Sequence, residues 1–337
     1  MMDFARKFLL TIPAETAHNL AIAALPLLPV QQTLPDDPIK VMGLNFKNKV
    51  GLAAGLDKNG EALSAWAKMG FGFVEIGTVT PLPQAGNPKP RMFRIPEKQA
   101  IINRMGFNNK GIDYLLRNLE EYRLNTSGGP LIGVNIGKNA ITPIHKATDD
   151  YLICLKKAYQ LADYITINIS SPNTKNLRSL QGKDQLQQLL ETLKAEQVVL
   201  AEKYQKYTPL VVKLAPDMSE EELLESIEVI KAVKLDGVIG TNTTLSRVEV
   251  QGFANADEAG GLSGGPLTER STQVVKTLTA HLPESIPVIA AGGVMNGDDA
   301  VEKIKAGAKL VQIYSGFIYG GTGLIEDVNK KLLDYQS

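Results

Sequence analysis

The sequence has one cysteine, Cys154, and three histidines, His18, His145 and His281, in 337 residues. A single cysteine cannot form an internal disulfide, and the histidines are too far apart in the sequence to give a metal-ligand spacing. We therefore predict a protein of a reducing compartment without a structural metal. Cys154 lies in an apolar, helix-like run, which indicates a buried packing residue rather than a nucleophile.

The chain also lacks a net charge, because 36 lysines and arginines balance 36 aspartates and glutamates. This balance gives no bulk attraction to nucleic acid, and we predict no nucleic-acid partner. The sequence has no GxxxxGK[ST] P-loop, and no GxGxxG fingerprint follows its first predicted strand. Nucleotide triphosphatases and Rossmann-type dinucleotide enzymes are therefore not supported. A hydrophobic content of 44% is enough for a substantial core.

The first thirty or so residues are apolar, but they contain no run of the ~20 residues that a membrane-spanning helix needs. Pro13 and Pro26 limit two short predicted helices, and the apolar run from Leu20 extends only to Val30. The segment offers a poor cleavage site for a secretory signal. Two interpretations of the helix pair remain open: a cap on the fold, or a pair that lies in a membrane interface.

From Val50 onward, short β-rich runs alternate with helical patterns. The predicted strands are Val50–Leu56, Phe71–Val79, Leu131–Gly137, Tyr164–Ser170, Pro209–Ala215, Gly237–Thr243, Ile286–Gly293 and Leu310–Gly316. The predicted helices are Glu61–Met69, Asp113–Tyr122, Ala147–Leu161, Gln185–Tyr204, Ser219–Val233, Thr268–Leu282, Asp298–Ala306 and Ile325–Leu333. Eight alternating units fit a closed parallel barrel better than an open sheet. The predicted fold is α/β, a (β/α)8 TIM barrel over residues 36–337 with an N-terminal helical extension over residues 1–35.

In such a barrel the site lies at the C-terminal ends of the strands, and here these ends are polar and glycine-rich. Tyr164–Ile169 is typical of a buried strand, and it runs directly into Ser170–Thr174, whose hydroxyls and amides can surround a small polar molecule. Ser, Asn and Pro are, however, also ordinary turn residues. Lys213 lies inside another apolar strand, where its burial requires an anion or a strongly polar group nearby.

Glycines and long connections complete the predicted site. Gly292–Gly293 and Gly316 follow the seventh and eighth strands, where barrels commonly bind phosphate, so a phosphorylated cofactor or substrate is expected. The segments 81–111 and 245–266 are predicted as loops that form a lid. Loops of this length in a compact domain are usually functional.

Seven segments at these strand ends and loops occur in a fixed order: AAGLDKN, EIGTVTP, NRMGFNN, NISSPNT, TNTT, GGLSG and QIYSG. Taken together, they resemble class 2 dihydroorotate dehydrogenase, the quinone-dependent and membrane-associated class, over essentially the whole chain. The resemblance implies an FMN-containing barrel that oxidises (S)-dihydroorotate to orotate in de novo pyrimidine (UMP) synthesis and reduces ubiquinone or menaquinone. It also implies peripheral binding to the cytoplasmic side of the cell inner membrane, with the helix pair admitting the quinone. The expected state is a monomer or weak homo-oligomer.

The resemblance also assigns roles to residues that match the motifs. The residues implied to bind FMN are Ala54, Gly55, Leu56, Asp57, Lys58, Thr78, Asn135, Asn168, Lys213, Thr241, Gly264, Gly293, Tyr314 and Ser315. The residues implied to bind the pyrimidine are Lys58, Asn103, Arg104, Met105, Gly106, Phe107, Asn168, Asn173, Asn242 and Thr243. Ser171 corresponds to the catalytic base of class 2, where class 1 enzymes have a cysteine. His18 and Arg94 resemble polar residues at the quinone end of the tunnel.

Two other functions remain in view. One is a soluble class 1 enzyme that uses fumarate or NAD, against which Ser171 and the apolar N-terminus both argue. The other is a membrane-docked flavin-binding protein without catalysis, which is expected to lack Ser171 or Lys58. Both residues are present.

Overall fold

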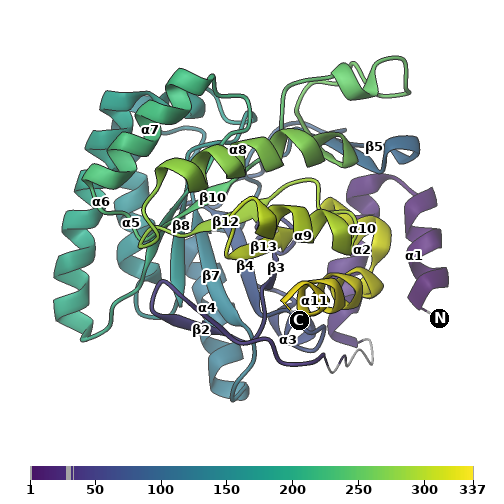
Figure 1. The fold of residues 1–337 in the computed structure, drawn as a ribbon, viewed down its shortest axis with the longest axis horizontal. Helices are drawn as coiled ribbons and strands as arrows, with labels where there is room; N and C mark the ends of the chain where they lie inside the picture. The colour runs from purple at the N-terminus through teal and green to yellow at the C-terminus, as the bar shows by residue number, and fades with distance from the viewer. Residues whose placement is uncertain (1, 28–31, 33, 337) are drawn as a thin grey trace.

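The computed structural model describes residues 2–27, 32 and 34–336, and its centre is a closed barrel of eight parallel strands (Figure 1). The strands follow the order β10-β12-β13-β3-β4-β7-β8-β9 around the barrel. Their bounds are β3 Val50–Leu52, β4 Phe73–Val79, β7 Leu131–Ile136, β8 Tyr164–Asn168, β9 Leu210–Leu214, β10 Gly237–Gly240, β12 Val288–Ala291 and β13 Leu310–Ile313. Each strand lies within one of the eight predicted strands, so the predicted barrel is confirmed.

The barrel strands are almost entirely buried, as expected when helices cover the outside and side chains fill the inside. At the N-terminal end of the barrel, Phe73, Tyr164 and other apolar side chains pack against the hairpin of β1 Ile39–Val41 and β2 Leu44–Phe46. The sequence patterns did not predict this hairpin, because each strand has three residues and buries only its last one.

Helices cover the outside of the barrel between successive strands (Figure 1). Their bounds are α3 Leu63–Ala67, α4 Ile112–Asn125, α5 Ala147–Ala158, α6 Lys183–Tyr204, α7 Glu220–Ala232, α8 Thr268–His281, α9 Gly297–Lys305, α10 Ser315–Gly320 and α11 Thr322–Gln336. All except the short α10 match predicted helices to within a few residues. The capping box at the start of α7 shows why the helix begins there: Ser219 Oγ accepts a hydrogen bond from the Glu222 N–H at 3.2 Å, and Glu222 Oε2 accepts one from the Ser219 N–H at 2.8 Å.

The two long segments predicted as loops instead meet in an antiparallel sheet, which we call the lid sheet. It consists of β5 Met92–Ile95, β6 Ala100–Asn103 and β11 Gly261–Gly264, in the order β11-β6-β5. A small apolar core that includes Ile95 and Leu262 packs behind it. The expectation of irregular loops was therefore wrong, because the pairing of β6 with β11 joins segments distant in the sequence and leaves no local pattern.

The predicted N-terminal helix pair is present as α1 Met2–Thr11 and α2 Ala14–Ala24, beside β5 at one edge of the molecule (Figure 1). Two arginines, Arg91 just before β5 and Arg94 within it, hold the helix pair against this strand. Arg91 Nη2 pairs with Glu15 Oε1 at 2.7 Å, and Arg94 Nη1 donates to the carbonyl of Ile12 at 2.7 Å.

Among the residues that the structure describes, no helix is both long enough and apolar enough to cross a membrane. The end of the predicted apolar run, at Val30, lies outside the described residues. The division of the chain at residue 35 stays a prediction.

Candidate active site

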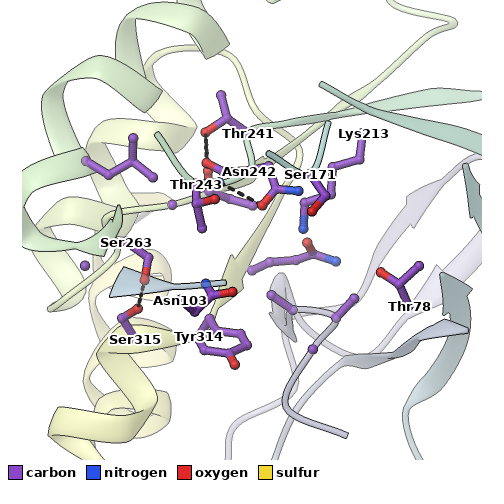
Figure 2. Close-up of a pocket in the computed structure, with 18 of the residues that line it drawn as sticks. Thr78, Asn103, Ser171, Lys213, Thr241, Asn242, Thr243, Ser263, Tyr314 and Ser315 are labelled. Atoms are coloured by element: carbon purple, nitrogen blue, oxygen red, sulfur yellow. Dashed lines mark hydrogen bonds between the residues drawn. The ribbon is translucent and has the colours of Figure 1, made fainter. Parts of the chain in front are cut away.

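A cavity with about 1000 Å³ of empty space, part of it open to solvent, lies at the C-terminal ends of the barrel strands and under the lid sheet. Most of the predicted site residues line it: Ala54, Gly55, Lys58, Thr78, Asn103, Met105, Gly106, Phe107, Asn168, Ser171, Asn173, Lys213, Thr241, Asn242, Thr243, Gly264, Gly293, Tyr314 and Ser315. Figure 2 shows Ser171, Lys213 and Asn242 on one side of this space and Tyr314 and Ser315 on another. Segments far apart in the sequence thus converge on one cavity.

Some predicted site residues do not line the cavity: Leu56, Asp57, Arg104, Asn135, His18 and Arg94. Leu56 packs in the main apolar core. The carboxylate of Asp57 accepts hydrogen bonds from the Ala62 N–H at 2.9 Å and from Trp66 Nε1 at 3.1 Å, which fixes the segment that leads into α3. Arg104 pairs with Glu258 at 2.5 Å on the lid.

The loop that carries Ser171 is held by short-range polar contacts at the end of β8. Ser171 Oγ accepts a hydrogen bond from the Asn173 N–H at 3.2 Å, and only 6% of Ser171 is exposed. The amide of Asn173 donates to the carbonyl of Asn103 at 3.0 Å. Since Asn103 ends β6, the loop and the lid sheet meet at the edge of the cavity.

A chain of directed hydrogen bonds orients the amides around the cavity. Asn242 Nδ2 donates to Ser170 Oγ at 2.8 Å, and Ser170 Oγ donates to Asn168 Oδ1 at 2.9 Å. Asn168 Nδ2 then donates to Thr78 Oγ1 at 2.9 Å, and Thr78 Oγ1 donates to Asn135 Oδ1 at 2.6 Å. Asn135 therefore lies behind the cavity wall and holds Thr78 in place. Such a satisfied network fixes side-chain directions before any ligand binds.

The chain of amides ends at a buried carboxylate inside the barrel. Asn135 Nδ2 donates to Glu75 Oε1 at 2.7 Å, and Gln312 Nε2 donates to Glu75 Oε2 at 2.8 Å. Thr166 Oγ1 and Tyr164 Oη also donate to Oε2, at 3.1 and 3.0 Å. Burial raises the pKa of Tyr164 well above its usual value, and the charge of Glu75 raises it further.

Two lysines bring positive charge to the cavity. Desolvation lowers the pKa of Lys58 to about 8, and the nearby charge of Arg91 lowers it as well. Lys58 Nζ donates to the carbonyl of Gly55 at 2.7 Å. Desolvation also lowers the pKa of Lys213, while the charge of Glu75 raises it. Both cations are suited to an anionic or strongly polar ligand.

Two buried oxygens of the cavity wall have no hydrogen-bond partner among the described residues: Thr243 Oγ1 and Gln312 Oε1. A buried polar atom without a partner is unfavourable by about 1–3 kcal/mol, so each indicates where a ligand atom fits. On another wall, Gly264 and Gly293 have φ of 96° and 70°, a backbone conformation that is strained for a residue with a side chain. A Cβ at Gly293 would lie 2.3 Å from Thr268 Cα, so only glycine fits there.

Residues 38–335 match the family model described as dihydroorotate dehydrogenase. The chain belongs to the dihydroorotate dehydrogenase family. A protein of Dechloromonas aromatica (strain RCB) named dihydroorotate dehydrogenase (quinone) is 54% identical over 334 residues, which cover 97% of this chain and 96% of that protein. A protein of the same name from Neisseria meningitidis serogroup A is 53% identical over 338 residues, covering 98% of this chain and 99% of that protein.

Solved structures give the same result. Ligand-free DHODH from Eimeria tenella matches with a TM-score of 0.88 and 40% identity, covering 95% of this chain and 94% of that one. DHODH from the same organism in complex with ferulenol gives a TM-score of 0.89 at 40% identity, with 95% and 91% covered. These findings confirm the predicted family, its resemblance to the quinone-dependent class and the barrel fold.

His18 belongs to α2, and Arg94 of β5 lies against the N-terminal helices, because its Nη1 donates to the carbonyls of Leu10 and Ile12 at 3.1 and 2.7 Å. Desolvation lowers the pKa of His18 to about 3, and the charge of Lys58 contributes. Between the helices and the cavity, Ala14 of α2 clusters with Met92, Ile101 and Met105, and Ile318 and Tyr319 of α10 pack against the cluster. Met105 also lines the cavity, so apolar packing is continuous from α2 to the site.

Gly292 and Gly316, which were expected near a phosphate, also line the cavity. Other lining residues were not among the predicted site residues: Ala53, Ser263, Leu267, Ala291, Val294, Met295 and Gln312. Several lie in the polar or glycine-rich segments already singled out. Gln312 interrupts an apolar strand in the same way as Lys213, and that signal could have found it. Leu267, Val294 and Met295 are ordinary apolar residues whose sequence context carries no sign of a cavity.

Proposed function

We propose that this chain oxidises (S)-dihydroorotate to orotate in pyrimidine synthesis, with FMN as its prosthetic group and a membrane quinone as the electron acceptor. One observation carries the proposal: a cavity lined by oriented amides, two lysines and Ser171 lies under the lid sheet, and apolar packing connects it to the N-terminal helix pair. The names of the curated relatives support the quinone as acceptor.

The polar groups that line the cavity are suited to bind FMN. Gly264, Gly293 and Ser315 would hold the phosphate. The positive φ of the two glycines allows close approach to the backbone, and Gly293 follows the seventh barrel strand, where barrels commonly bind phosphate. Lys213 and the unpartnered Gln312 Oε1 would bind the polar edge of the flavin ring. The other lining residues proposed for the cofactor are Ala54, Gly55, Lys58, Thr78, Asn168, Thr241 and Tyr314. Leu56, Asp57 and Asn135, which do not line the cavity, would support this wall from behind. FMN, when bound, supplies a two-electron acceptor for the substrate.

Lys58 would pair with the carboxylate of dihydroorotate, because its ammonium lies at the cavity wall and is only partly balanced by the charges of Glu15 and Asp57. The amides and hydroxyl of the wall suit a ring edged with C=O and N–H groups. We assign Asn103, Asn168, Asn173, Asn242 and Thr243 to this ring edge, with Arg104, Met105, Gly106 and Phe107 as the neighbouring lid residues.

Ser171 would remove the proton from C5 of dihydroorotate and pass its own hydroxyl proton to Thr174 or to a water chain. Its hydroxyl lies in the same cavity as the amides that would hold the ring, and it is shielded from water by burial. A serine is a weak base at neutral pH, so its position close to the carbon acid matters more than its basicity. The fixed charge of Lys213 would stabilise negative charge that develops on the cofactor side of the cavity.

The helix pair would lie in the membrane surface and admit the quinone. Phe8 and Leu20 expose 58% and 52% of their surface on it, and Leu27 of the following 3-10 helix Leu25–Leu27 exposes 84%. Exposed apolar side chains on short amphipathic helices fit peripheral binding to a membrane interface, here the cytoplasmic side of the inner membrane. His18 and Arg94 would contact the quinone head at the inner end. We propose a monomer or weak homo-oligomer.

Orotate formation in lipid vesicles tests the function. Purified protein, dihydroorotate and vesicles with a long-tailed quinone should form orotate, and omission of the quinone should stop turnover. Fumarate or NAD in its place should give no turnover. Turnover with either soluble acceptor at the quinone rate would instead support a class 1 enzyme, and no turnover with any acceptor would support a flavin-binding protein without catalysis.

A further inference from the structure

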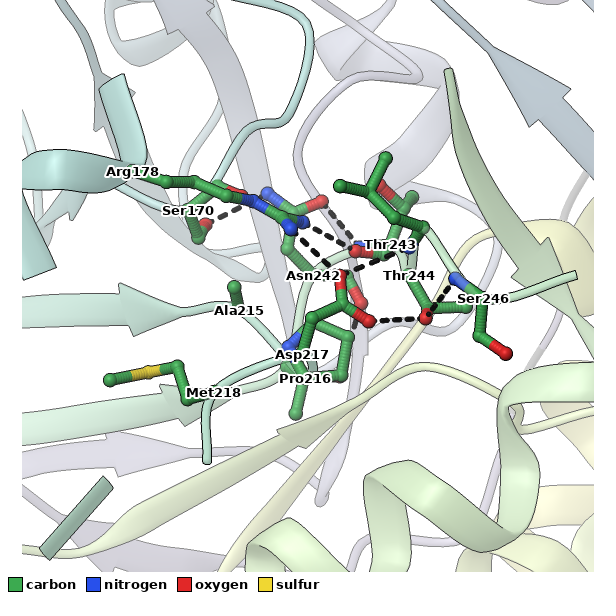
Figure 3. Close-up of polar contacts among 12 residues, drawn as sticks. Ser170, Arg178, Ala215, Pro216, Asp217, Met218, Asn242, Thr243, Thr244 and Ser246 are labelled. Atoms are coloured by element: carbon green, nitrogen blue, oxygen red, sulfur yellow. Dashed lines mark hydrogen bonds and ion pairs between the residues drawn. The ribbon is translucent and has the colours of Figure 1, made fainter. Parts of the chain in front are cut away.

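Arg178 binds three partners with the three nitrogens of one guanidinium group (Figure 3). Nε donates to the carbonyl of Ser170 at 2.8 Å, Nη2 donates to the carbonyl of Thr243 at 2.9 Å, and Nη1 pairs with Asp217 Oδ2 at 2.7 Å. Ser170 follows β8, Asp217 follows β9 and Thr243 follows β10. The planar guanidinium therefore ties together the ends of three neighbouring barrel strands.

Asp217 extends this contact to the lid sheet. Its carboxylate accepts hydrogen bonds from Thr244 Oγ1 and from the Leu245 N–H, the latter at 3.0 Å. Thr244 in turn exchanges two backbone hydrogen bonds with Leu262 of β11, at 3.0 and 2.8 Å. In the lid sheet, β11 pairs with β6, the strand that ends at Asn103. Arg178 and Asp217 thus connect the Ser171 loop to the lid.

Neither side chain lines the cavity, so both act through the residues they hold. Arg178 donates hydrogen bonds to the carbonyl of Ser170, the residue before Ser171, and to the carbonyl of Thr243, a residue proposed to bind the pyrimidine. The loop between β8 and the 3-10 helix Leu177–Gln181 has no helix or strand of its own to fix it. The side chains of Arg178 and Asp217 are 20% and 25% exposed, which shields their charges more than in a fully exposed pair.

We propose that Arg178 and Asp217 are positioning residues that set the distance between the proposed base, Ser171, and the pyrimidine site at Asn242 and Thr243. This inference rests on the proposed function. Proton abstraction from carbon is sensitive to small misplacements, and a displacement of about 1 Å can slow such a step ~10²-fold. The two residues would therefore control the rate of the chemical step without touching the substrate.

The chain offers a matched control at the opposite end of the same strand. Arg123 Nη2 pairs with Asp163 Oδ2 at 2.6 Å, and Asp163 immediately precedes β8. The Arg123–Asp163 pair is similarly shielded, with side chains 33% and 19% exposed. Arg123→Gln therefore removes a comparable ion pair far from the cavity.

Anaerobic flavin reduction by dihydroorotate is the first readout. At saturating substrate, Arg178→Gln should reduce the rate by about 10- to 100-fold with FMN still bound, and Arg178→Lys should recover part of it. The pH profile of the reduction rate should shift in Arg178→Gln. Arg123→Gln should keep both the rate and the profile. A folded, FMN-loaded Arg178→Gln protein with the wild-type rate and profile would overturn the proposal, as would an equal loss in Arg123→Gln.

A second readout does not depend on the reaction. In Ser171→Cys protein, iodoacetamide reports access to the loop, while the other thiol, Cys154, is fully buried and has a pKa raised by burial. Adding Arg178→Gln should raise the alkylation rate about 10-fold or more, because the loop opens, and adding Arg123→Gln should not. Equal rates in all three proteins would contradict the positioning role. If dihydroorotate fails to reduce the wild-type protein, the proposed function fails, while this readout still decides whether Arg178 holds the loop.

Discussion

At the residue scale, the chemistry depends on Ser171, a weak base whose position must compensate for its low basicity. Ser171→Ala should leave FMN bound and orotate affinity nearly unchanged, and it should slow flavin reduction by at least the ~10²-fold typical of losing a positioned base. Ser171→Cys should be the mildest replacement, because a thiolate can accept the proton. Stopped-flow absorbance of the flavin measures both. Wild-type reduction by the alanine variant at neutral pH would remove Ser171 from the mechanism.

Lys58 gives a prediction about pH. Its pKa is lowered to about 8, so the ammonium loses its charge as the pH rises through 8. If Lys58 pairs with the carboxylate, orotate should bind about tenfold more weakly at pH 9 than well below pH 8. Lys58→Ala should weaken binding at pH 7 by about 10-fold or more and remove this pH dependence. Isothermal titration with orotate tests both statements, and a dissociation constant that is flat from pH 7 to 9 in the wild type would place the carboxylate elsewhere.

Most of the cavity residues were predicted from the resemblance of their motifs to the family. A few were also predicted from the residues themselves, because burying a polar residue in an apolar strand is unfavourable and therefore conspicuous. Lys213 and Asn168 are such residues, and both line the cavity. Leu267 and Val294 line it as well, but an apolar side chain gives no local sign of whether it faces a ligand or the core. Arg178 was missed for another reason: a polar residue after a turn is normally exposed, and only the fold shows its three partners.

At the element scale, His18 of α2 should make the stability of the folded protein depend on pH. The pKa of His18 is lowered to about 3 from an ordinary value near 6.5, so between these values the unfolded chain binds more protons than the folded one. Stability should therefore fall as the pH drops below 6.5. His18→Gln should reduce the loss of thermal midpoint between pH 7 and 5, which calorimetry can measure. An identical pH dependence in the variant and the wild type would show that His18 is not desolvated by its packing.

The barrel elements were predictable and the lid sheet was not, for a physical reason. Each barrel strand is buried on both faces, so a run of β-branched residues marks it, and the helix after it has its own period. The strands β5, β6 and β11 are four residues each. β5 and β6 form a local hairpin, but β11 pairs with β6 from a distant part of the sequence. Register of that kind is set only when the barrel brings the two segments together.

At the scale of the whole molecule, the proposed flavin and pyrimidine residues all lie beyond residue 50, and the exposed apolar helices lie before it. Deleting residues 1 to about 30 should therefore separate the two half-reactions. Dihydroorotate should still reduce FMN, whereas oxidation by a long-tailed quinone in lipid should fall sharply and a small soluble acceptor should be affected less. Stopped-flow absorbance of the flavin can measure the rate of its reduction by dihydroorotate and, separately, the rate of its reoxidation by each acceptor.

The truncated protein must first be shown to be folded and FMN-loaded, because the same helices cover apolar surface whose exposure favours aggregation. Suppose a soluble, loaded truncation still uses long-tailed quinone at the full rate, and the intact protein does not bind lipid vesicles. The helix pair would then be a structural cap, which is the other interpretation that the sequence left open.

The most direct test of the central claim is the anaerobic visible spectrum of the purified protein before and after addition of dihydroorotate. The cavity geometry and the family predict a flavin spectrum that bleaches on mixing, with orotate formed in a one-to-one ratio to the flavin reduced. Ser171→Ala protein is the matched control and should bleach slowly. A protein without flavin absorbance, or a flavin spectrum that dihydroorotate leaves unchanged, would contradict the assignment of this cavity to dihydroorotate oxidation.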